Sequence, residues 1–476
     1  MRDIPLVVDV DGTLLRGDLL YESALALLMT QPLEGVKIPF WLVGGRSQLK
    51  SQIADRVTID ADLLPLDATV LAFIRREKER GRRVFLASAS NQHLVNALAA
   101  RLGMIDGVFA SSANVNMSAH KKRDVLVEAF GEGGFDYIGD SRADVPVWWA
   151  ARRGYIVRAG VLNPLRLSPQ LTQRVDVLAE RPVRFRSIVK ALRLHQWAKN
   201  LLLFVPLVLG GASGNPEVVR RTVICFLAFG LLASATYVVN DLFDLTNDRR
   251  HPRKQHRPLA SGVLSIPHAS VLILAGLCAG LGIGVALGLP VFFGLVGYLA
   301  ATLSYSLWLK SKPIVDVVLL GGLYTWRLFV GVLVANVMLS PWLIVFSFAF
   351  FLSLSLTKRH TEINSMVEGR AVKLPGRGYQ STDGPFVLSM GVAAGMSSIL
   401  IFVLYLVEGA FHAAYFRRPE LLWVCPLILL LWLCRIWLLS SRGLLHEDPV
   451  VFAIVDRKSL VLGALAGLAV LASLFG

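Results

Sequence analysis

The sequence predicts a chain of two parts: an N-terminal α/β domain of the Rossmann type, followed by an all-α polytopic membrane domain with nine transmembrane helices. Two observations lead to this prediction. The first 165 or so residues mix charged groups with short apolar segments, as in a soluble α/β domain. From about Trp197 onward the chain is a series of apolar runs of roughly 20 residues, the length that crosses a bilayer. We expect the soluble domain at 1–165, a linker with a basic amphipathic interfacial helix at 166–198, and the membrane domain at 199–476.

The net charge of +15 raises the question of a nucleic-acid partner. The basic residues cluster in short loops between apolar runs, where positive charge sets membrane topology and meets anionic lipid headgroups. No RNA- or DNA-binding motif accompanies them. We therefore expect membrane lipids and no nucleic acid as partners, and the sequence does not define an oligomeric state. The first residues, MRDIPLVVDVDGT, contain too short an apolar stretch for a signal peptide, so we expect the N-terminal domain in the cytoplasm.

Four segments of the soluble domain carry groups that suit phosphoryl chemistry. LVVDVDGT is a buried type of strand that ends in Asp9, Asp11 and a glycine turn, and RVFLAS is a strand that ends in the hydroxyl of Ser88. The two further segments are HKKRDVLVEAFG, with Lys122, and FDYIGDSRAD, with Asp140 and Asp144. The roughly 70 residues between the first two segments predict a mostly helical cap insert.

Together these segments resemble motifs I to IV of the haloacid-dehalogenase (HAD) phosphatases in order and spacing. The resemblance implies that Asp9 is the nucleophile, which becomes an aspartyl-phosphate, and that Asp11 is the general acid/base. Ser88 would hold a phosphoryl oxygen. Lys122 would neutralise the aspartyl-phosphate, with Lys121 as the competing candidate.

The same resemblance implies a Mg²⁺ site. Asp140 would bind the ion with Asp9 and a backbone carbonyl, and Asp144 would support that arrangement. The metal candidates of this domain are Asp9, Asp11, Asp140 and Asp144.

Nine apolar runs predict the membrane helices of the second part. They lie at about 200–214, 219–239, 268–289, 291–309, 314–336, 341–357, 385–407, 420–439 and 458–475. Loops after the second and sixth runs are rich in Lys and Arg, whereas the turns at 289–291 and 337–340 contain none. This asymmetry places the basic loops, and the soluble domain, on the cytoplasmic face of an inner or plasma membrane. Ahead of the first run, the stretch from Arg184 to Lys199 alternates basic and apolar residues and predicts a helix on the membrane surface.

The stretch YVVNDLFDLTNDRRHPRKQHRPLASG, from Tyr237 to Gly262, is the most informative part of the membrane domain. Steps of three and four place Asp241, Asp244 and Asp248 on one helical face, beside Asn240. Carboxylates this close repel each other unless a cation lies among them, and oxygen ligands suit Mg²⁺. A basic cluster follows directly and could hold the rest of a polyphosphate. The stretch therefore predicts a magnesium–pyrophosphate site.

Other polar groups are predicted on the same side of the membrane. Tyr305 and Lys310 close the fourth run, and the loop after the sixth run offers Lys358, Arg359 and Tyr379. We interpret His360 as a loop residue, because no second histidine follows at ligand spacing. Asp316 and Arg327 share a face of the fifth helix, where an intramembrane charge faces a partner or a polar cavity, and a structural arrangement of these two residues is the alternative.

The second part resembles the UbiA prenyltransferase superfamily, through its nine runs and the NDxxDxxxD motif after the second. RLHQWAKNLLLFVPL, NDLFDLTNDRRHPRKQHRPLASG, YSLWLK and EDPVVFAIVDR resemble the decaprenyl-phosphate phosphoribosyltransferase branch most. This branch takes 5-phosphoribosyl 1-pyrophosphate as donor, and a polyprenyl phosphate attacks C1 of the ribose. The resemblance implies that the acidic motif, Asn240, Asp241, Asp244 and Asp248, holds Mg²⁺ on the leaving pyrophosphate. The candidates for phosphate or substrate binding are Lys199, Lys254, Arg257, Tyr305, Lys310, Arg327, Lys358, Arg359 and Tyr379.

The fusion of the two parts predicts a bifunctional enzyme. Transfer would leave a 5-phosphate on the ribose, and a tethered HAD domain could remove it to give polyprenyl-phosphoryl ribose. One alternative is an aromatic prenyltransferase that uses a prenyl pyrophosphate donor, with a separate or regulatory HAD domain. Another is a transporter or receptor whose intramembrane charges line a pathway, although the charges gather on one face rather than along a path.

Overall fold

The computed structural model describes residues 4–111, 117–159, 169–181, 185–338, 340–368, 377–413, 416–445 and 448–475. The end of the predicted soluble domain, 160–165, and parts of the predicted linker, 166–168 and 182–184, lie outside the described residues. The chain forms two compact units: residues 1–192 with 238–272, and residues 193–237 with 273–476. The acidic stretch from Asn240 to Asp248 belongs to the first unit.

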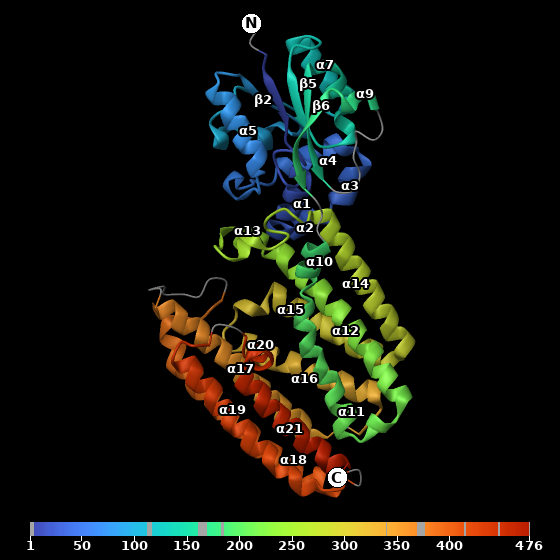
Figure 1. Cartoon of the computed structure of the whole chain (residues 1–476), viewed down its shortest axis with the longest axis vertical. Coiled ribbons are helices and arrows are strands. Elements are labelled where there is room, and N and C mark those ends of the chain that lie inside the picture. The colour runs from blue at the N-terminus through green and yellow to red at the C-terminus, as the bar shows by residue number, and fades with distance from the viewer. Residues whose placement is uncertain are drawn as a thin grey trace. The chain divides into compact units, whose positions relative to one another are not determined.

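A six-stranded parallel sheet organises the first unit (Figure 1). Its order is β3-β2-β1-β4-β5-β6, with every neighbouring pair parallel. The strands are β1 (Leu6–Asp9), β2 (Val84–Asn91), β3 (Gly107–Ser111), β4 (Asp136–Gly139), β5 (Arg153–Ala159) and β6 (Val175–Arg181). The order reverses at β1, because β2 pairs with one of its edges and β4 with the other. The predicted α/β domain is thus present as a parallel sheet.

Helices cover both faces of this sheet, because successive strand residues point to opposite sides. Leu6 and Val8 pack on one face with residues of α5 (Ala68–Glu79) and α6 (Gln92–Leu102). Val7 packs on the other face with residues of α7 (Ala119–Phe130), α8 (Val145–Ala150) and α9 (Pro169–Thr172). Two apolar layers therefore fix the position of every strand end.

The insert between β1 and β2 is largely helical, as predicted. It contains α1 (Leu19–Thr30), α2 (Pro32–Gly35), α3 (Ile38–Val43), α4 (Arg46–Ala54) and a 3₁₀ turn, η1 (Ala61–Leu63). Leu27 of α1 packs against Leu49 and Ile53 of α4 in a small core of its own.

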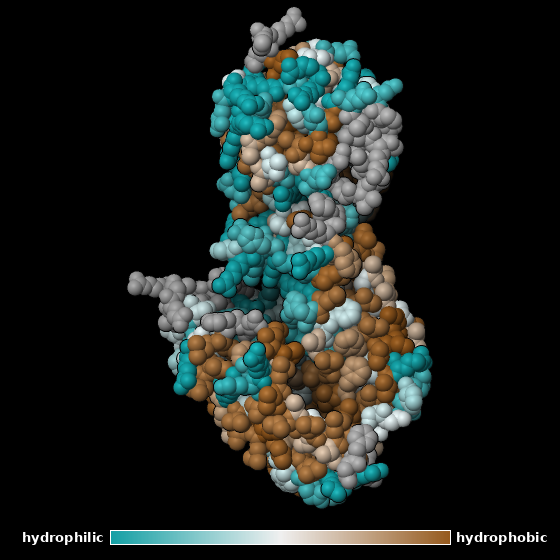
Figure 2. Space-filling view, in the orientation of Figure 1, coloured by the Kyte–Doolittle hydropathy of each residue, from teal (hydrophilic) through white to brown (hydrophobic). Residues whose placement is uncertain are grey.

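Eight helices are long and apolar enough to cross a membrane among the residues that the structure describes. They are α12 (Pro216–Phe243), α14 (Ile266–Leu287), α15 (Leu289–Leu307), α16 (Val315–Ala335), α17 (Pro341–Glu368), α18 (Gly384–Glu408), α19 (Val424–Ser441) and α21 (Arg457–Phe475). On the face that Figure 2 shows, the helices of the second unit carry mostly hydrophobic side chains. Leu274, Leu400 and Leu427 are each more than 60% exposed, which suits contact with lipid rather than water.

The prediction of nine spans is corrected at the first run, 200–214. There the structure has a 3₁₀ helix, η4 (Leu194–Phe204), followed by α11 (Val205–Leu209), and this apolar segment is shorter than the eight helices. The predicted surface helix also breaks, because α10 (Phe185–Leu192) ends before Arg193, which adopts a left-handed conformation with φ 49°.

Helix α16 forms the centre of the second unit. Leu323 and Val330 belong to an apolar cluster with α12 and α15, whereas Tyr324 and Leu328 belong to another with α17, α18 and α19. Small residues allow this close packing. A Cβ on Gly331 of α16 would lie 2.5 Å from the carbonyl oxygen of Leu203, so only glycine lets η4 approach this closely.

We expect Asp136→Ala to destabilise the first unit by about 2 kcal/mol, because it removes a buried acceptor of three charge-assisted hydrogen bonds, while Arg82 keeps Glu77 as a partner. Asp136 is fully buried and accepts hydrogen bonds from Arg82 and, at 2.9 and 2.7 Å, from Arg152. The matched control is Asp176→Ala, which removes an exposed pair with Arg153 and costs less than about 1 kcal/mol. Thermal unfolding of the purified protein measures both, and equal losses would contradict the prediction.

Candidate functional site

The carboxyl ends of β1 and β4 form the first candidate site. In an open parallel sheet, the crevice for a ligand lies where neighbouring strands send the chain in opposite directions. Asp9 is the last residue of β1, and Asp140 directly follows β4. Gly12 allows the turn after β1 to pass close by: its φ is +78°, and a Cβ there would lie 2.2 Å from a carboxylate oxygen of Asp140.

Lys122 brings a positive charge into this crevice. Its ammonium donates to Asp9 Oδ1 at 2.7 Å and to the hydroxyl of Tyr137 at 3.1 Å, and it lies 3.4 Å from Asp144 Oδ1. Lys122 is buried, whereas Lys121 is exposed to solvent. Of the two lysines that the sequence left open, Lys122 is therefore the one that contacts Asp9.

Asp144 holds the turn that presents Asp140. Its Oδ2 accepts hydrogen bonds from the amides of Asp140 and Ser141 at 3.2 and 3.1 Å and from the Ser141 hydroxyl at 3.0 Å. Its Oδ1 accepts from Tyr137 at 2.7 Å. This arrangement fits a supporting role for Asp144.

Asp11 and Ser88 contact each other. Asp11 Oδ2 accepts hydrogen bonds from the hydroxyls of Ser88 and Ser90, both at 2.7 Å, and Oδ1 accepts from the amide of Leu19 at 2.8 Å. Ser88, whose hydroxyl is predicted to hold a phosphoryl oxygen, thus donates to Asp11, the predicted general acid/base.

Burial and mutual repulsion dominate the electrostatics of this site. Burial raises the pKa of Asp9 well above its ordinary value, even though the charge of Lys122 opposes the change. Burial and the charge of Asp144 raise the pKa of Asp140 to about 7. For Lys122, burial would lower the pKa, but the carboxylates of Asp9 and Asp144 outweigh it and raise the pKa.

These carboxylates fit a divalent cation. Oxygens of Asp9, Asp140 and Asp144 lie within 4.8 Å of one another, and this is the one such acidic group among the described residues. A hard cation such as Mg²⁺ prefers carboxylate oxygens and would offset the repulsion that raises their pKa. Asp11, also a predicted ligand, is absent from the group because Ser88, Ser90 and Leu19 hold it elsewhere.

The acidic stretch after α12 is arranged differently from the prediction. The helix ends at Phe243, Asp244 lies at the junction, and α13 (Leu245–Arg250) begins anew, so the carboxylates do not share one continuous helix. Arg257 donates to Asp241 Oδ1 at 3.1 Å and to Asp248 Oδ2 at 2.6 Å. Asn240 donates to Asp244 Oδ2 at 3.0 Å. One guanidinium thus contacts two of the carboxylates predicted to bind a cation and offsets part of their repulsion, which explains how they lie close to each other.

Two candidate lysines of the second unit meet at one carboxylate. Lys199 and Lys358 lie 3.3 and 3.2 Å from Asp448 Oδ2, while Asp448 Oδ1 accepts from the amide of Val450 and so begins α20 (Pro449–Val455). Burial would raise the pKa of Asp448, but the charges of Lys358 and Lys199 outweigh it and hold the pKa below its ordinary value. Two ammonium groups on one carboxylate leave a net positive charge, which suits an anion.

Asp316 contacts two more of the residues predicted to bind phosphate or substrate, Arg359 and Tyr379. Tyr379 donates to its Oδ1 at 2.7 Å, and the guanidinium groups of Arg359 and Arg377 lie 2.7 and 3.4 Å from its Oδ2. Arg359 is fully buried and also pairs with Glu362. The predicted loop after residue 357 is instead helical as far as Glu368, which corrects the placement of Lys358, Arg359 and His360 in a loop.

Arg327 does not pair with Asp316. It donates to Asn200 Oδ1 at 3.1 Å, to the carbonyl of Leu323 at 2.7 Å and to the hydroxyl of Tyr298 at 2.8 Å. Asp316 has the different partners described above, which corrects the structural alternative that joins these two residues. With three protein acceptors, Arg327 fits the role of a buried structural cation better than that of a phosphate ligand.

The remaining candidates lie near the end of α15, which contains Tyr305, and on two short 3₁₀ turns. Tyr305 accepts a hydrogen bond from Arg377 at 3.1 Å, Lys310 lies in η7 (Leu309–Ser311), and Lys254 is exposed in η6 (Lys254–His256).

Sequence reasoning missed several residues that shape these sites. Arg181 of β6 donates to the carbonyl of Gly12 at 2.6 Å and to Asp67 at 2.8 Å, and no sequence signal links it to a turn about 170 positions away. Tyr137 was hidden inside an apolar strand. Asp448 lies in the segment EDPVVFAIVDR, where an Asp-Pro pair before an apolar run is typical of a helix start, but its contacts with Lys199 and Lys358 had no sequence signal.

Residues 201–454 match the UbiA prenyltransferase family, and the chain belongs to this family. It is therefore an integral membrane enzyme of the UbiA transferase class.

A relative from Sinorhizobium fredii, named uncharacterized protein y4nM, is 39% identical over 98% of this chain and 90% of its own length. The decaprenyl-phosphate phosphoribosyltransferase of Mycobacterium tuberculosis is 33% identical over 46% of this chain and 74% of its own length. The structure of a UbiA homolog from Archaeoglobus fulgidus bound to GPP and Mg²⁺ is 16% identical, with a TM-score of 0.46, over 60% of this chain and 98% of that one.

We expect Asp140→Asn to weaken one class of Mn²⁺ site at least tenfold, because it removes a carboxylate from the group at the ends of β1 and β4. Asp18→Asn is the matched control: Asp18 lines the same pocket but lies outside the acidic group, and asparagine still caps α1. Electron paramagnetic resonance of the full-length protein titrated with Mn²⁺ counts the sites. An unchanged titration in Asp140→Asn would exclude a cation there.

Proposed function

We propose that this protein is a bifunctional enzyme that builds a polyprenyl-phosphoryl ribose. In the first step, phosphoribose passes from 5-phosphoribosyl 1-pyrophosphate to a polyprenyl phosphate. In the second, an HAD-type site removes the 5-phosphate. One observation carries the proposal: a chain with 33% identity to a decaprenyl-phosphate phosphoribosyltransferase also contains the buried Asp9–Lys122 pair beside Asp140.

The transfer step forms one bond and breaks another. A phosphate oxygen of the acceptor attacks C1 of the ribose, and the bond from C1 to the pyrophosphate oxygen breaks. Asn240, Asp241, Asp244 and Asp248 would hold Mg²⁺, which supplies positive charge to the leaving pyrophosphate. The net positive charge of Lys199 and Lys358 around Asp448 supports a role in holding phosphate. Arg257 is the further candidate, because it already contacts two of the carboxylates.

The second step uses the crevice at β1 and β4. Asp9 attacks the phosphorus, the bond from phosphorus to the ribose 5-oxygen breaks, and Asp11 gives a proton to the departing oxygen. Water then cleaves the aspartyl-phosphate with Asp11 as base. Lys122 neutralises charge on the phosphoryl group, and the hydroxyl of Ser88 orients Asp11. Asp9, Asp140 and Asp144 fit the Mg²⁺ that such a site uses.

The membrane topology predicted from the sequence supports the action of both sites on one lipid. The basic residues that follow α12 favour a cytoplasmic position for the acidic stretch, and the N-terminal domain belongs on the same face. Because one chain carries both activities, the second site meets the lipid product at a high effective concentration.

We expect Asp241→Asn and Asp244→Asn to lower transfer at least 100-fold, since each removes a carboxylate that would hold the Mg²⁺ that offsets the charge of the pyrophosphate. Glu217→Gln is the matched control, because Glu217 is an exposed carboxylate at the other end of α12. Purified protein is incubated with labelled 5-phosphoribosyl 1-pyrophosphate or with a prenyl pyrophosphate, and mass spectrometry identifies the lipid product. Turnover of the prenyl donor with a quinone precursor alone would favour an aromatic prenyltransferase.

We expect Asp9→Asn to leave transfer intact and to accumulate the lipid that still carries the 5-phosphate, because the nucleophile of the second step is lost. The same mass spectrum reports the phosphate count. Asp176→Asn, at an exposed position of β6, should behave as the wild type. Continued formation of the dephosphorylated lipid by Asp9→Asn would refute the second activity.

A further inference from the structure

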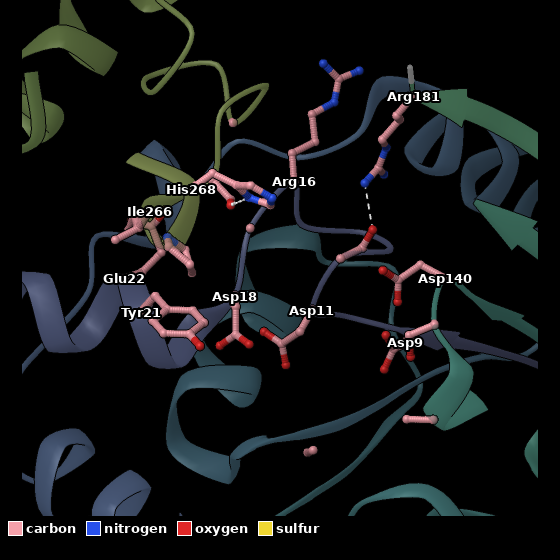
Figure 3. A pocket seen from close by; sticks show the side chains of 18 of the residues that line it. Asp9, Asp11, Arg16, Asp18, Tyr21, Glu22, Asp140, Arg181, Ile266 and His268 are labelled. Carbon is pink, nitrogen blue, oxygen red and sulfur yellow. Dashed lines mark hydrogen bonds between the residues drawn. The ribbon is translucent and has the colours of Figure 1, made fainter. Parts of the chain in front are cut away.

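The pocket that contains Asp9, Asp11 and Asp140 has a second wall far along the sequence. Its volume is about 640 Å³, and residues 259–268 line the side away from the acidic group. Figure 3 shows the acidic residues at one end of the pocket, and Ile266 and His268 at the other, beside Tyr21 and Glu22. All of these residues belong to the first unit.

A buried ion pair anchors this wall, which we call segment 259–268. Arg249 donates to both carboxylate oxygens of Glu22, at 3.0 and 2.6 Å, and both side chains are about nine-tenths buried. The same guanidinium donates to the carbonyl of Ala260 at 3.3 Å. A bidentate pair fixes both distance and orientation, so Arg249 ties the start of the segment to α1 of the insert.

Gly262 brings the segment against the turn after β1. Its φ is +71°, and a Cβ there would lie 2.6 Å from the carbonyl oxygen of Arg16. The two backbones therefore touch, and a larger residue would separate them. The contact is a built feature of the pocket, because the ion pair and the glycine hold the segment at two points.

The two ends of the pocket differ in chemistry. The end at β1 and β4 carries the carboxylates and Lys122, which suit a phosphate with a cation. The other end is mostly apolar, with Val263, Ile266 and Pro267 from the segment and Tyr21 from α1, and its polar residues Ser265 and His268 hydrogen-bond to each other. Val263 and Tyr21 are 41% and 44% exposed, so apolar surface faces the pocket without a protein partner covering it.

A pocket with a charged end and an apolar end selects an amphiphile. Its volume lies in the range of about 300–1,000 Å³ that encloses drug-sized ligands, and apolar walls give such ligands most of their affinity. A small hydrophilic phosphate ester would occupy the charged end and leave the apolar wall exposed to water. A phosphate ester with a lipid chain would cover the wall and remove apolar surface from water.

We propose that segment 259–268 is the specificity wall of the phosphatase site and that the site prefers a phosphate monoester borne on a lipid-linked sugar to a soluble one. This proposal rests on the phosphatase activity proposed above and names its substrate class. The phosphate lies at Asp9, and the apolar part of the substrate lies against Val263 and its neighbours. Glu22 is a positioning residue, because it acts through Arg249 on the segment.

The test compares two substrates on the full-length protein in detergent. One is polyprenyl-phosphoryl 5-phosphoribose, and the other is ribose 5-phosphate. We expect Val263→Asp to lower kcat/KM for the lipid substrate at least tenfold, because it places a charge on the apolar wall, and to change that for ribose 5-phosphate less than twofold. Val177→Asp is the matched control, since Val177 is 43% exposed on β6 and lies outside the pocket. We expect Glu22→Gln to lower kcat/KM for the lipid substrate only, mainly by raising KM.

The outcomes separate this inference from the phosphatase activity itself. Loss of both hydrolyses in Asp9→Asn, with selective loss of the lipid reaction in Val263→Asp, supports both proposals. Absence of any hydrolysis by the wild type, or its survival in Asp9→Asn, contradicts the phosphatase activity. Equal changes for both substrates in Val263→Asp, or no change for either, overturn the specificity wall while leaving the phosphatase intact. Hydrolysis of ribose 5-phosphate also reports that each variant is folded.

Discussion

Neutralisation of buried charge is the constraint on which both units depend. A charge removed from water is costly unless a partner of opposite sign lies beside it, and the cost rises as the surroundings become apolar. Asp136 between Arg82 and Arg152, Lys122 beside Asp9 and Asp316 beside Arg359 all satisfy this requirement. Two of the clusters named as candidate sites share one further property, which is that their charges do not balance within the cluster. Three carboxylates at the ends of β1 and β4 face one lysine, and two lysines face Asp448. Each of these two clusters carries an excess of charge that a ligand of opposite charge can complete, whereas Asp316 and Glu362 balance Arg359 and Arg377.

Much of the fold follows from patterns that one sequence contains. Strands at Asp9 and Ser88 were predicted from short apolar runs, and β1 and β2 lie there; eight long apolar helices also lie close to eight of the predicted runs. The first run was misjudged because its apolar residues do not reveal that the backbone winds as a 3₁₀ helix. The end of α17 was misplaced for a related reason. Charged residues after 357 ended the apolar pattern, yet the backbone stays helical because Arg359 and His360 find partners inside the bundle.

The site was predictable in its residue types and not in its pairings. Spacing placed Asp241, Asp244 and Asp248 together, but it gave no reason to place Arg257 between two of them. Asp316 and Arg327 share a helix and differ in sign, yet each found a partner on another element, because contact depends on the neighbours that packing supplies. Arg181 and Asp448 came from distant positions for the same reason. Local periodicity reports one element at a time, whereas a charge cluster is assembled from several elements.

The 3₁₀ winding of η4 changes how far this segment reaches. A 3₁₀ helix rises about 2.0 Å per residue, compared with about 1.5 Å for an α-helix. The segment Leu194–Leu209, which is 3₁₀ over its first eleven residues, therefore extends roughly 30 Å along its axis. An α-helix needs about twenty residues to extend as far, and the hydrocarbon layer of a bilayer has about the same thickness. The slimmer cross-section also brings its backbone against Gly331. Axial rise, and not residue number alone, therefore sets how far the segment extends, although His195, Gln196, Lys199 and Asn200 make its first part polar.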